Sequence, residues 1–454
     1  MRLHRLLLGV ALFLACLAGL AAEALPPTDA WTVELGLTDD IRMHLSVARW
    51  VRFATSRWGI RLLDGRAFQT RWGLLRLSGA DGNRALNVRC SPCVVRSSAI
   101  DGRAAFRLDV ALRLARVEDQ LSGRLAVNGL AMDFSGTLTD NGFQGEFALN
   151  DVPVRDLYGL FASAIPELGF AHIHGTITAY GRFSLPEGTL EISPEVHGFE
   201  VRGLGTERLA WGAFHYRCAS PSGVAHVCRS GEGVADWVPL QQVGRWLPRA
   251  VMAAEDARFF DHPGYDLIEI VAALQSDLDG QHFHRGGSTL GQQLARSLFL
   301  TPDKTLARKL REILYAVEME QTLGKKRLLT LYLNTIEWGP GIHGARQAAQ
   351  TYFGKEPKDL RPEEAAWLAA ILRNPWKAWG TQFRTGTPDA ERVAWVVGRM
   401  MGLKRAEKER ALARCLRFAE ARPLASLVAE KLAKDTGRDT SSDLASIQAS
   451  SERN

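Results

Sequence analysis

The sequence reads EDARFFDHPG at residues 255–264, RGGSTLGQQ at 285–293, RKLRE at 308–312 and KRLLTLYLN at 326–334. These four blocks bring two carboxylates, several cations, a glycine turn and paired amide side chains into one stretch of the chain. Such a set suits chemistry on an anionic, sugar-bearing substrate, because cations and amides bind phosphate oxygens and hydroxyl groups. The blocks therefore direct attention to the C-terminal half of the chain.

Helices are expected around these blocks. Between residues 306 and 323 the apolar residues form a stripe at i, i+4, i+7 and i+11, which is typical of one helix face, with Glu312 on the opposite side. The stripe consists of Leu306, Leu310, Ile313 and Val317. Two more helices are expected at 344–353 and 362–373, since Gly354 favours a helix end and Pro362 a first turn.

The sequence pattern of the first half of the chain predicts strands instead of helices. Apolar and polar residues alternate between about residues 30 and 230, as in strands with one buried face. The alternating apolar residues include Phe106, Leu108, Val110, Leu112 and Leu114, then Leu130, Met132 and Phe134, then Phe143, Phe147 and Leu149. The dipeptides that suit hairpin turns are Asp64-Gly65, Asp81-Gly82, Asp101-Gly102 and Asn141-Gly142. The pattern indicates an antiparallel, meander-like sheet with one helix near residues 154–165.

The chain has 454 residues, which is too many for one ordinary domain. We expect a signal or membrane anchor at 1–25, a β-rich domain at 26–230, a catalytic domain at 231–390 and a helical extension with a polar tail at 391–454. The fold class is therefore multidomain α+β. The net charge of +6 is mildly basic, and nucleic acid is not expected as a partner because no nucleic-acid motif is present.

The first residues have the character of an export segment. Arg2 and Arg5 precede an uncharged run over residues 6–22, and Glu23 ends it. The length of this run lies between that of a signal-peptide core and that of a short transmembrane helix. In either case we expect the remainder of the chain to be exported.

Six cysteines suit an oxidising compartment. Cys90 and Cys93 are close in sequence, as are Cys218 and Cys228, and these four are candidates for structural disulfides. A redox or zinc role for Cys90 and Cys93 is the alternative. No second Cys-x-x-Cys and no His-x-x-x-His completes a zinc site, and no thioredoxin-like pattern surrounds Cys90.

Glu255 is the candidate general base. Shielding from water by neighbours such as Phe259 and His262 can raise the proton affinity of a carboxylate toward what a base needs near neutral pH. Asp256 adjoins it and is expected to shape the site. Taken alone, Glu255 would sooner be interpreted as a helix cap or as an ion-pair partner of Arg258.

The second and third blocks supply candidate ligands for sugar hydroxyls and phosphate oxygens. Gly286 and Gly287 allow the backbone to approach a ligand closely. The candidate substrate-binding side chains are Arg285, Ser288, Thr289, Gln292, Gln293, Arg296, Arg308 and Lys309. The alternatives are an ordinary turn with a helix cap for the second block, and a surface ion-pair cluster around Glu312 for the third.

In this order, the four blocks resemble the family 51 glycosyltransferases, which include the peptidoglycan-polymerising domain of bifunctional penicillin-binding proteins and the monofunctional transglycosylases. The resemblance covers about residues 237–385. Through it, Glu255 matches the catalytic glutamate of the family, and Glu312 matches a second glutamate implicated in handling the leaving group. The remaining motif positions, expected to be structural, are Asp256, Phe259, His262, Gly264, Gly286, Gly287, Lys326 and Asn334.

The resemblance implies a mostly helical, lysozyme-like catalytic domain on the periplasmic side of the cytoplasmic membrane. Its substrates would be lipid II and the growing glycan strand, and its reaction an inverting transfer in which Glu255 takes the proton of the C4 hydroxyl. The lipid diphosphate would leave toward Arg296, Arg308 and Lys309. A divalent cation, Mg²⁺ or Mn²⁺, is a further expectation at the diphosphate, and cell-wall synthesis proteins are candidate partners of the β-rich domain.

Several positions refine the resemblance. Thr330 and the segment IEWGPGIHG at 336–344 are similar to the monofunctional enzymes. The chain contains no Ser-x-x-Lys and no Lys-Thr-Gly, so a penicillin-reactive transpeptidase is not expected. The family usually has Thr, Lys and Asn at the positions of Gly291, Arg296 and Ser297, so details of sugar recognition are expected to differ.

Two other functions compete with polymerisation. A lysozyme-like hydrolase could use the two glutamates, but hydrolysis of a neutral glycan does not need the cations near Glu312. An envelope scaffold that binds lipid II or glycan without turnover would be consistent with the departures at Gly291, Arg296 and Ser297.

Overall fold

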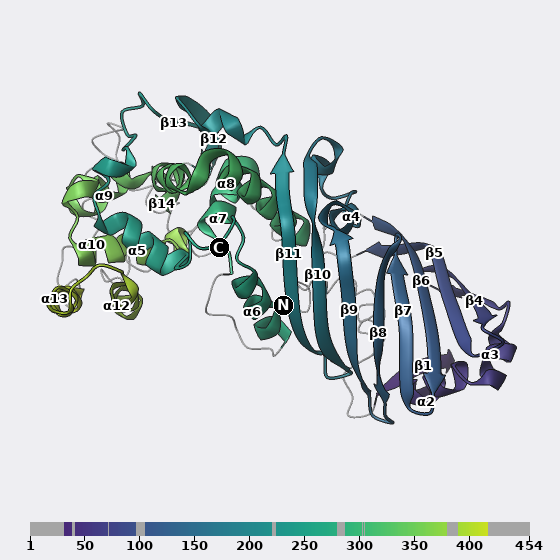
Figure 1. Cartoon of the computed structure of the whole chain (residues 1–454). Coiled ribbons are helices and arrows are strands. Elements are labelled where there is room, and N and C mark those ends of the chain that lie inside the picture. The colour runs from purple at the N-terminus through teal and green to yellow at the C-terminus, as the bar shows by residue number, and fades with distance from the viewer. Residues whose placement is uncertain are drawn as a thin grey trace. The chain divides into compact units, whose positions relative to one another are not determined.

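The computed structural model describes residues 31–38, 41–70, 72–96, 105–219, 224–278, 287–301, 303, 305–378 and 389–415. The expected export segment at 1–25, the Asp101-Gly102 turn and the polar end of the tail lie outside these residues. Contacts within the chain define two compact units, and Figure 1 labels their elements. The first unit comprises Met1–Gly203, Leu267–Arg285 and Asp303–Arg311, and the second comprises Leu204–Asp266, Gly286–Pro302 and Glu312–Asn454. The domain limits expected from the sequence stay predictions.

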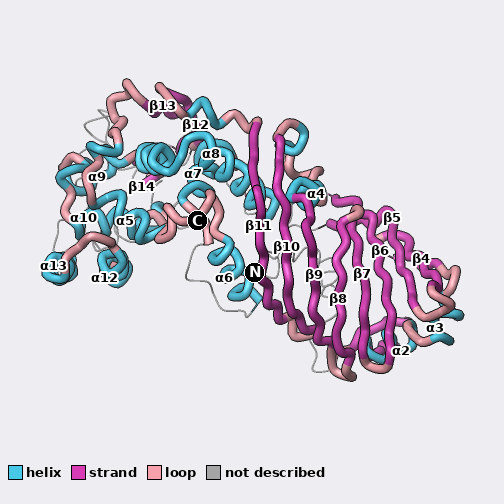
Figure 2. Tube along the Cα trace, in the orientation of Figure 1, coloured by secondary structure: helices cyan, strands magenta, loops and turns pink. Residues whose placement is uncertain are grey.

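The first unit is built on a large antiparallel sheet. Within the described residues it has nine strands in the order β11-β10-β9-β8-β7-β6-β5-β4-β3, so each strand pairs with its neighbours in the chain (Figure 2). The strands are β3 Ala67–Thr70, β4 Gly73–Ala80, β5 Ala85–Arg96, β6 Ala105–Val117, β7 Gln120–Val127, β8 Leu130–Leu138, β9 Phe143–Pro153, β10 His172–Leu185 and β11 Thr189–Arg202. A separate pair is formed by β1 Thr32–Thr38 and β2 Ile41–Ser46. The predicted antiparallel meander is confirmed.

The alternation in the sequence corresponds to the two faces of this sheet. In β8 the side chains of Leu130, Met132 and Phe134 are buried, whereas Asp133 and Ser135 are exposed. Successive side chains in a strand point to opposite faces, so one face of the sheet forms the core.

The predicted turns have two outcomes. Asp81 and Gly82 both have positive φ and join β4 to β5, as a hairpin dipeptide should. Asp64 instead caps the end of a helix before β3, so the hairpin predicted at Asp64-Gly65 is wrong. The period-two pattern does not distinguish a turn between strands from a turn that follows a short helix.

Short helices accompany the sheet in the first unit. They are α2 Val47–Ala54, α3 Arg57–Leu63, α4 Val154–Gly159, the 3-10 turn η1 Pro166–Gly169 and α6 Leu267–Leu278. The helix expected near residues 154–165 is therefore α4, and it is shorter than predicted. Ile60 and Leu63 of α3 pack with Leu86 of β5 in a buried cluster. Glu167 of η1 is buried and accepts hydrogen bonds from Arg311, at 2.9 Å from Nε and 2.7 Å from Nη2.

The second unit is mostly helical. Its helices are α5 Trp246–Glu255, α7 Leu290–Phe299, α9 Ala345–Phe353, α10 Pro362–Ile371, α12 Ala390–Arg399 and α13 Arg405–Cys415, with 3-10 turns η2 Thr206–Leu209, η3 Leu240–Gln242 and η4 Pro357–Asp359. Its strands are β12 Ala213–Ala219, β13 Ala225–Gly231, β14 Glu337–Gly339 and β15 Ile342–His343. The predicted helix ends are confirmed, since Gly354 caps α9 in the left-handed conformation and Pro362 opens α10. The α+β class is confirmed.

Helix α8, Leu306–Thr335, contains the helix predicted at 306–323, and Gly324 interrupts its geometry with φ of 73°. Glu312, expected opposite the apolar stripe, is fully buried, and all side chains from Leu314 to Glu318 are buried too, so the alternative of a surface ion-pair cluster does not hold for Glu312. A helix at the centre of a helical unit is covered on all sides, so a single apolar stripe describes it incompletely. The division between the two units falls within α8, between Arg311 and Glu312.

Among the described residues, none of the helices combines the length and the apolar character needed to cross a bilayer.

Candidate active site

Glu255 is the last residue of α5, and its side chain is only 11% exposed. Gln293 of α7 donates a hydrogen bond from Nε2 to Glu255 Oε2 at 3.0 Å. Nη2 of Arg392 lies 3.7 Å from the other carboxylate oxygen and donates to the carbonyl of Ala254 at 3.1 Å. Three segments that are far apart in the sequence therefore converge on this carboxylate.

The environment of Glu255 raises the pKa of its carboxyl group. Burial raises the pKa of this carboxyl above its ordinary value. The hydrogen bond from Gln293 and the positive charges of Arg392, Arg296 and Arg373 act in the opposite direction, but burial dominates. A carboxylate with raised proton affinity is suited to accept a proton near neutral pH.

Tyr332 fixes the orientation of Gln293. Its hydroxyl donates to Gln293 Oε1 at 2.9 Å, which leaves the amide nitrogen directed at Glu255. The pKa of Tyr332 is raised well above its ordinary value, mainly by burial and also by the charge of Glu255, so the phenol remains a proton donor. Gln293 thus holds the carboxylate, and the substrate binding predicted for it stays a prediction.

The remaining residues of the first block tie the end of α5 to neighbouring elements. Asp256 accepts hydrogen bonds from the backbone N–H of Leu290 at 2.9 Å and from Nε2 of His262 at 3.0 Å. The carbonyl of His262 accepts from Nζ of Lys325 at 2.5 Å, and Phe259 is almost fully buried against the His262 ring. These contacts are those of positioning residues.

The start of α7 uses two of the predicted substrate ligands internally. Thr289 Oγ1 accepts from the backbone N–H of Gln292 at 3.2 Å and donates to the carbonyl of Gly264 at 2.8 Å. The side chain of Gln292 accepts in return from the backbone of Thr289, which completes a capping box. Both side chains are buried, so the geometry supports the helix-cap alternative for them.

The other residues of the second block differ in how they are placed. Gly287 and Ser288 are half-buried just before α7, and Arg296 is exposed on α7. Arg285 and Gly286 lie outside the described residues.

Gly264 and Gly291 both face Ala316 of α8. A Cβ atom on Gly291 would lie 3.3 Å from the Cβ atom of Ala316, and one on Gly264 would lie 2.8 Å from its carbonyl oxygen. Gly264 also has φ of +90°, which favours glycine. The departure at Gly291, expected to alter sugar recognition, is therefore located at a close approach of α7 to α8.

The third and fourth blocks are divided between the units. Arg308 and Lys309 belong to the first unit and are half-buried, and the guanidinium of Arg308 donates to the carbonyl of Asp303. Glu312 belongs to the second unit. Lys326 is exposed after the break at Gly324, and its carbonyl accepts from the Thr330 hydroxyl at 2.7 Å.

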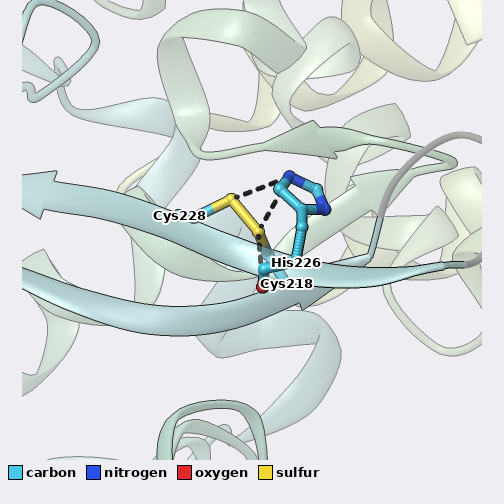
Figure 3. Close-up of side chains that lie close together, drawn as sticks. All are labelled: Cys218, His226 and Cys228. Atoms are coloured by element: carbon cyan, nitrogen blue, oxygen red, sulfur yellow. Dashed lines mark hydrogen bonds between the residues drawn. A yellow bond between two sulfur atoms is a disulfide. The ribbon is translucent and has the colours of Figure 1, made fainter.

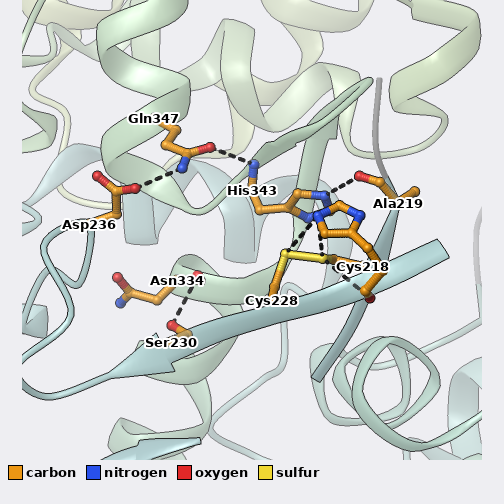
Figure 4. Close-up of a disulfide and its surroundings, with 9 residues drawn as sticks. Cys218, Ala219, Cys228, Ser230, Asp236, Asn334, His343 and Gln347 are labelled. Atoms are coloured by element: carbon orange, nitrogen blue, oxygen red, sulfur yellow. Dashed lines mark hydrogen bonds between the residues drawn. A yellow bond between two sulfur atoms is a disulfide. The ribbon is translucent and has the colours of Figure 1, made fainter. Parts of the chain in front are cut away.

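Asn334 ties the end of α8 to the segment after β13. Its Oδ1 accepts from the N–H of Val238 at 2.8 Å, and its Nδ2 donates to the carbonyls of Val238 at 2.9 Å and Thr330 at 2.8 Å. Its own carbonyl accepts from Ser230 of β13 at 3.5 Å (Figure 4). All hydrogen-bonding groups of this side chain therefore serve the fold.

The structure pairs the four candidate cysteines as two disulfides, Cys90 with Cys93 and Cys218 with Cys228. The second bridge links β12 to β13, and His226 Nε2 lies 3.2 Å from the sulfur of Cys218 and 3.5 Å from that of Cys228 (Figure 3). These three side chains form the group of potential metal ligands found among the described residues. Disulfide sulfurs are not thiolates, and Mg²⁺ and Mn²⁺ prefer oxygen ligands, so this group does not fit the expected cation.

Three residues around Glu255 were not predicted from the sequence. Arg392 lies beyond the segment that resembles the family, Arg373 is the last residue of the helix expected at 362–373, and Tyr332 lies within the fourth block. A buried carboxylate calls for nearby cations. The positions of Arg373 and Arg392 follow no local pattern, so only the fold identifies them, whereas the membership of Tyr332 in the fourth block is a signal that the sequence does offer.

The first unit carries an open groove of about 930 Å³ on its sheet. Cross-strand pairs line part of it, including Arg124 with Asp133 at 3.5 Å and Arg182 with Glu146 at 3.1 Å. None of the predicted catalytic or substrate-binding residues is among its lining residues.

Comparison with known proteins matches the part of the chain that contains these residues. Residues 224–401 match the family model described as Transglycosylase. The chain is similar to the biosynthetic peptidoglycan transglycosylases of Nitrosomonas eutropha (48% identity over 139 residues, 31% of this chain and 57% of the relative), Aeromonas hydrophila subsp. hydrophila (44% over 170 residues, 37% and 69%) and Thiobacillus denitrificans (40% over 166 residues, 37% and 70%). The chain thus spans between 57% and 70% of the length of these three relatives. The matched region contains Glu255, Gln293 and Glu312. Because the chain is 44% and 40% identical to two of these relatives over more than two thirds of their length, it belongs to the transglycosylase family.

Proposed function

We propose that this protein is a peptidoglycan glycosyltransferase that polymerises lipid II into glycan strands and releases undecaprenyl diphosphate, without transpeptidase activity. The observation that carries the proposal is the largely shielded carboxylate of Glu255, whose pKa is raised by burial while three guanidinium groups act on it. The names of the relatives support a peptidoglycan substrate.

In the proposed reaction, Glu255 accepts the proton of the C4 hydroxyl of an incoming lipid II. The C4 oxygen forms a bond to C1 of the growing glycan as the bond from C1 to the diphosphate breaks. The bonding pair leaves with the lipid diphosphate, C1 is inverted, and Glu255 later releases its proton to water. Gln293 and Tyr332 hold the carboxylate in place for this transfer.

Positive charge is the second contribution of the chain. Arg296, Arg373 and Arg392 all act electrostatically on Glu255. Fixed cations stabilise negative charge that develops on a departing diphosphate. Arg308 and Lys309 are proposed for the same diphosphate on the strength of the family resemblance.

A divalent cation, Mg²⁺ or Mn²⁺, is also proposed at the diphosphate. In the described part of the chain no three acidic, imidazole or thiolate groups gather around Glu312. The ion would therefore take most of its ligands from the diphosphate and water, as Mg²⁺ commonly does, with Glu312 as the ligand from the chain. When bound it would neutralise charge on the leaving group. We expect EDTA to lower glycan synthesis and added Mg²⁺ or Mn²⁺ to restore it, and full activity in EDTA would remove the cation from the proposal.

The proposal includes a lysozyme-like helical catalytic domain on the periplasmic side of the cytoplasmic membrane. The β-rich domain is proposed to bind cell-wall synthesis proteins.

Incubation of the purified full chain with labelled lipid II tests the proposed reaction. Long glycan strands resolved on gels support polymerisation, shortening of added glycan supports a hydrolase, and binding without product supports a scaffold. Glu255→Gln should abolish strand formation, because the amide cannot accept the proton. Glu207→Gln, an exposed glutamate of the same unit, is the matched control and should retain it.

A further inference from the structure

Helices α2 and α3 of the first unit, both labelled in Figure 1, carry an exposed face rich in tryptophan and arginine. This Trp–Arg face consists of Arg49, Trp50, Phe53, Arg57, Trp58, Arg61 and Leu62. Trp58 is 70% exposed, Leu62 48% and Trp50 45%. Large apolar side chains that are exposed as a group mark interaction surfaces.

The fold holds these side chains outward together. In each helix the exposed residues are adjacent or one turn apart, which places them on one side. The rings form a continuous row, with centroids 6.0 Å apart for Trp50 and Phe53 and 6.3 Å apart for Phe53 and Trp58. The opposite side of α3 is anchored by the fully buried Ile60 and by Leu63. The aromatic row therefore cannot turn inward without disrupting the core.

The charge of this surface is positive. Residues 47–63 contain four arginines and neither aspartate nor glutamate. Arg52 pairs with Asp119 at 3.2 Å and with Asp140. Within the described residues, no ion pair involves the three arginines of the Trp–Arg face. Their charge is therefore available to an anionic surface.

We propose that the Trp–Arg face docks onto the surface of an anionic phospholipid bilayer. Indole rings favour the interface between headgroups and acyl chains, and arginines bind lipid phosphates while their stems cover apolar surface. Helices of 8 and 7 residues are far too short to span a bilayer, so they lie in the plane of the interface. This docking depends on no step of the proposed reaction.

Side-chain oxidation of the full chain in vesicles tests this docking. The protein is reconstituted into phosphatidylcholine vesicles with or without phosphatidylglycerol, exposed to hydroxyl radicals and analysed by peptide mass spectrometry. We expect Trp50 and Trp58 to oxidise about fivefold more slowly when the anionic lipid is present, since each arginine near such a surface is attracted to it. Raising the salt concentration should remove most of this protection. Trp211 of the second unit is 85% exposed and serves as the internal reference, with no change expected.

Variants separate charge from structure. Replacing Arg49, Arg57 and Arg61 together by Gln should abolish the protection, whereas replacing them by Lys should preserve most of it. All three are exposed, so circular dichroism should show an unchanged fold. Equal oxidation of Trp50 and Trp58 in both kinds of vesicle would overturn the proposal. Protection that persists in the Gln variant, or that rises with protein concentration in uncharged vesicles, would also overturn it, the latter by indicating a second copy of the chain as the occupant. Because no lipid II is present, failure of polymerisation leaves this experiment unaffected.

Discussion

The ionised form of Glu255 is needed to accept a proton, but burial makes this form costly for the stability of the fold. Its raised pKa means that the folded unit prefers the neutral carboxyl, so stability is fully present at low pH and declines as pH rises through the folded pKa. Glu255→Gln should lower glycan synthesis by about 10²–10⁴-fold, as loss of a general base does. The same variant should melt at a higher temperature than the wild type at pH 8 and differ little at pH 4. A melting temperature at pH 8 that falls would show that Glu255 is stabilised by its cations more than it is penalised by burial.

Glu337 provides a second test of buried charge. Burial raises the pKa of this carboxyl to about 7, although hydrogen bonds from Trp376 and from the backbone of Gly341 oppose the shift. The folded unit should therefore lose stability as pH rises through about 7, and Glu337→Gln should remove that loss. Thermal unfolding at pH 6 and pH 9 measures it, with a smaller difference expected for the variant. Glu391→Gln on the exposed surface of α12 is the control and should behave like the wild type.

The sequence identifies Glu255 as the candidate general base and shows its motif, but it does not reveal the environment of this carboxylate. Glu255, Asp256 and His262 occur within eight residues, so a motif identifies them. Arg392 approaches Glu255 from 137 positions further along the chain, and only the packing of α12 near α5 brings it there. The hydrogen bonds of Gln293 are not predictable from its block for the same reason, because its partner Tyr332 lies on another helix.

At the scale of elements, the crossing of α7 and α8 depends on a small residue. Gly291→Thr, which introduces the residue usual in the family, should destabilise the protein by about 1–3 kcal/mol, since added atoms would press on Ala316. The double variant Gly291→Thr/Ala316→Gly should recover part of this loss. Urea unfolding of the four proteins of this cycle gives the coupling. Additive effects would show that the two positions do not share the contact.

Helix α8 shows where periodicity fails. An apolar stripe identified the helix and its extent up to Gly324, but Glu312 and Glu318 are buried on it. Glu318 Oε1 accepts from the backbone N–H of Leu204 at 2.8 Å, so a charged residue can lie inside when the fold supplies a donor. The sheet was easier to predict, because its hairpins join neighbours in the chain and its two faces differ in polarity.

At the scale of a compact unit, the stability of the first unit depends on the ion pair between Glu167 and Arg311. Glu167 is 2% exposed, and Arg311 contacts both of its carboxylate oxygens. Arg311→Met should destabilise the first unit by about 3–5 kcal/mol, because a buried carboxylate loses its partner. Hydrogen exchange over residues 154–202 should accelerate more than exchange in the second unit. Adding Glu167→Gln should restore part of the protection, and exchange that accelerates equally in both units would contradict a local role.

The chain passes between its two units five times, at Gly203, Asp266, Arg285, Pro302 and Arg311. The first unit therefore includes α6 and the beginning of α8, which are encoded within the region that matches the transglycosylase family. A genetic exchange at Gly203 would transfer a sheet without α6 and without the arginine that neutralises Glu167. We expect this sheet to be inherited only together with the helical half, so a gene that carries the sheet alone should be rare.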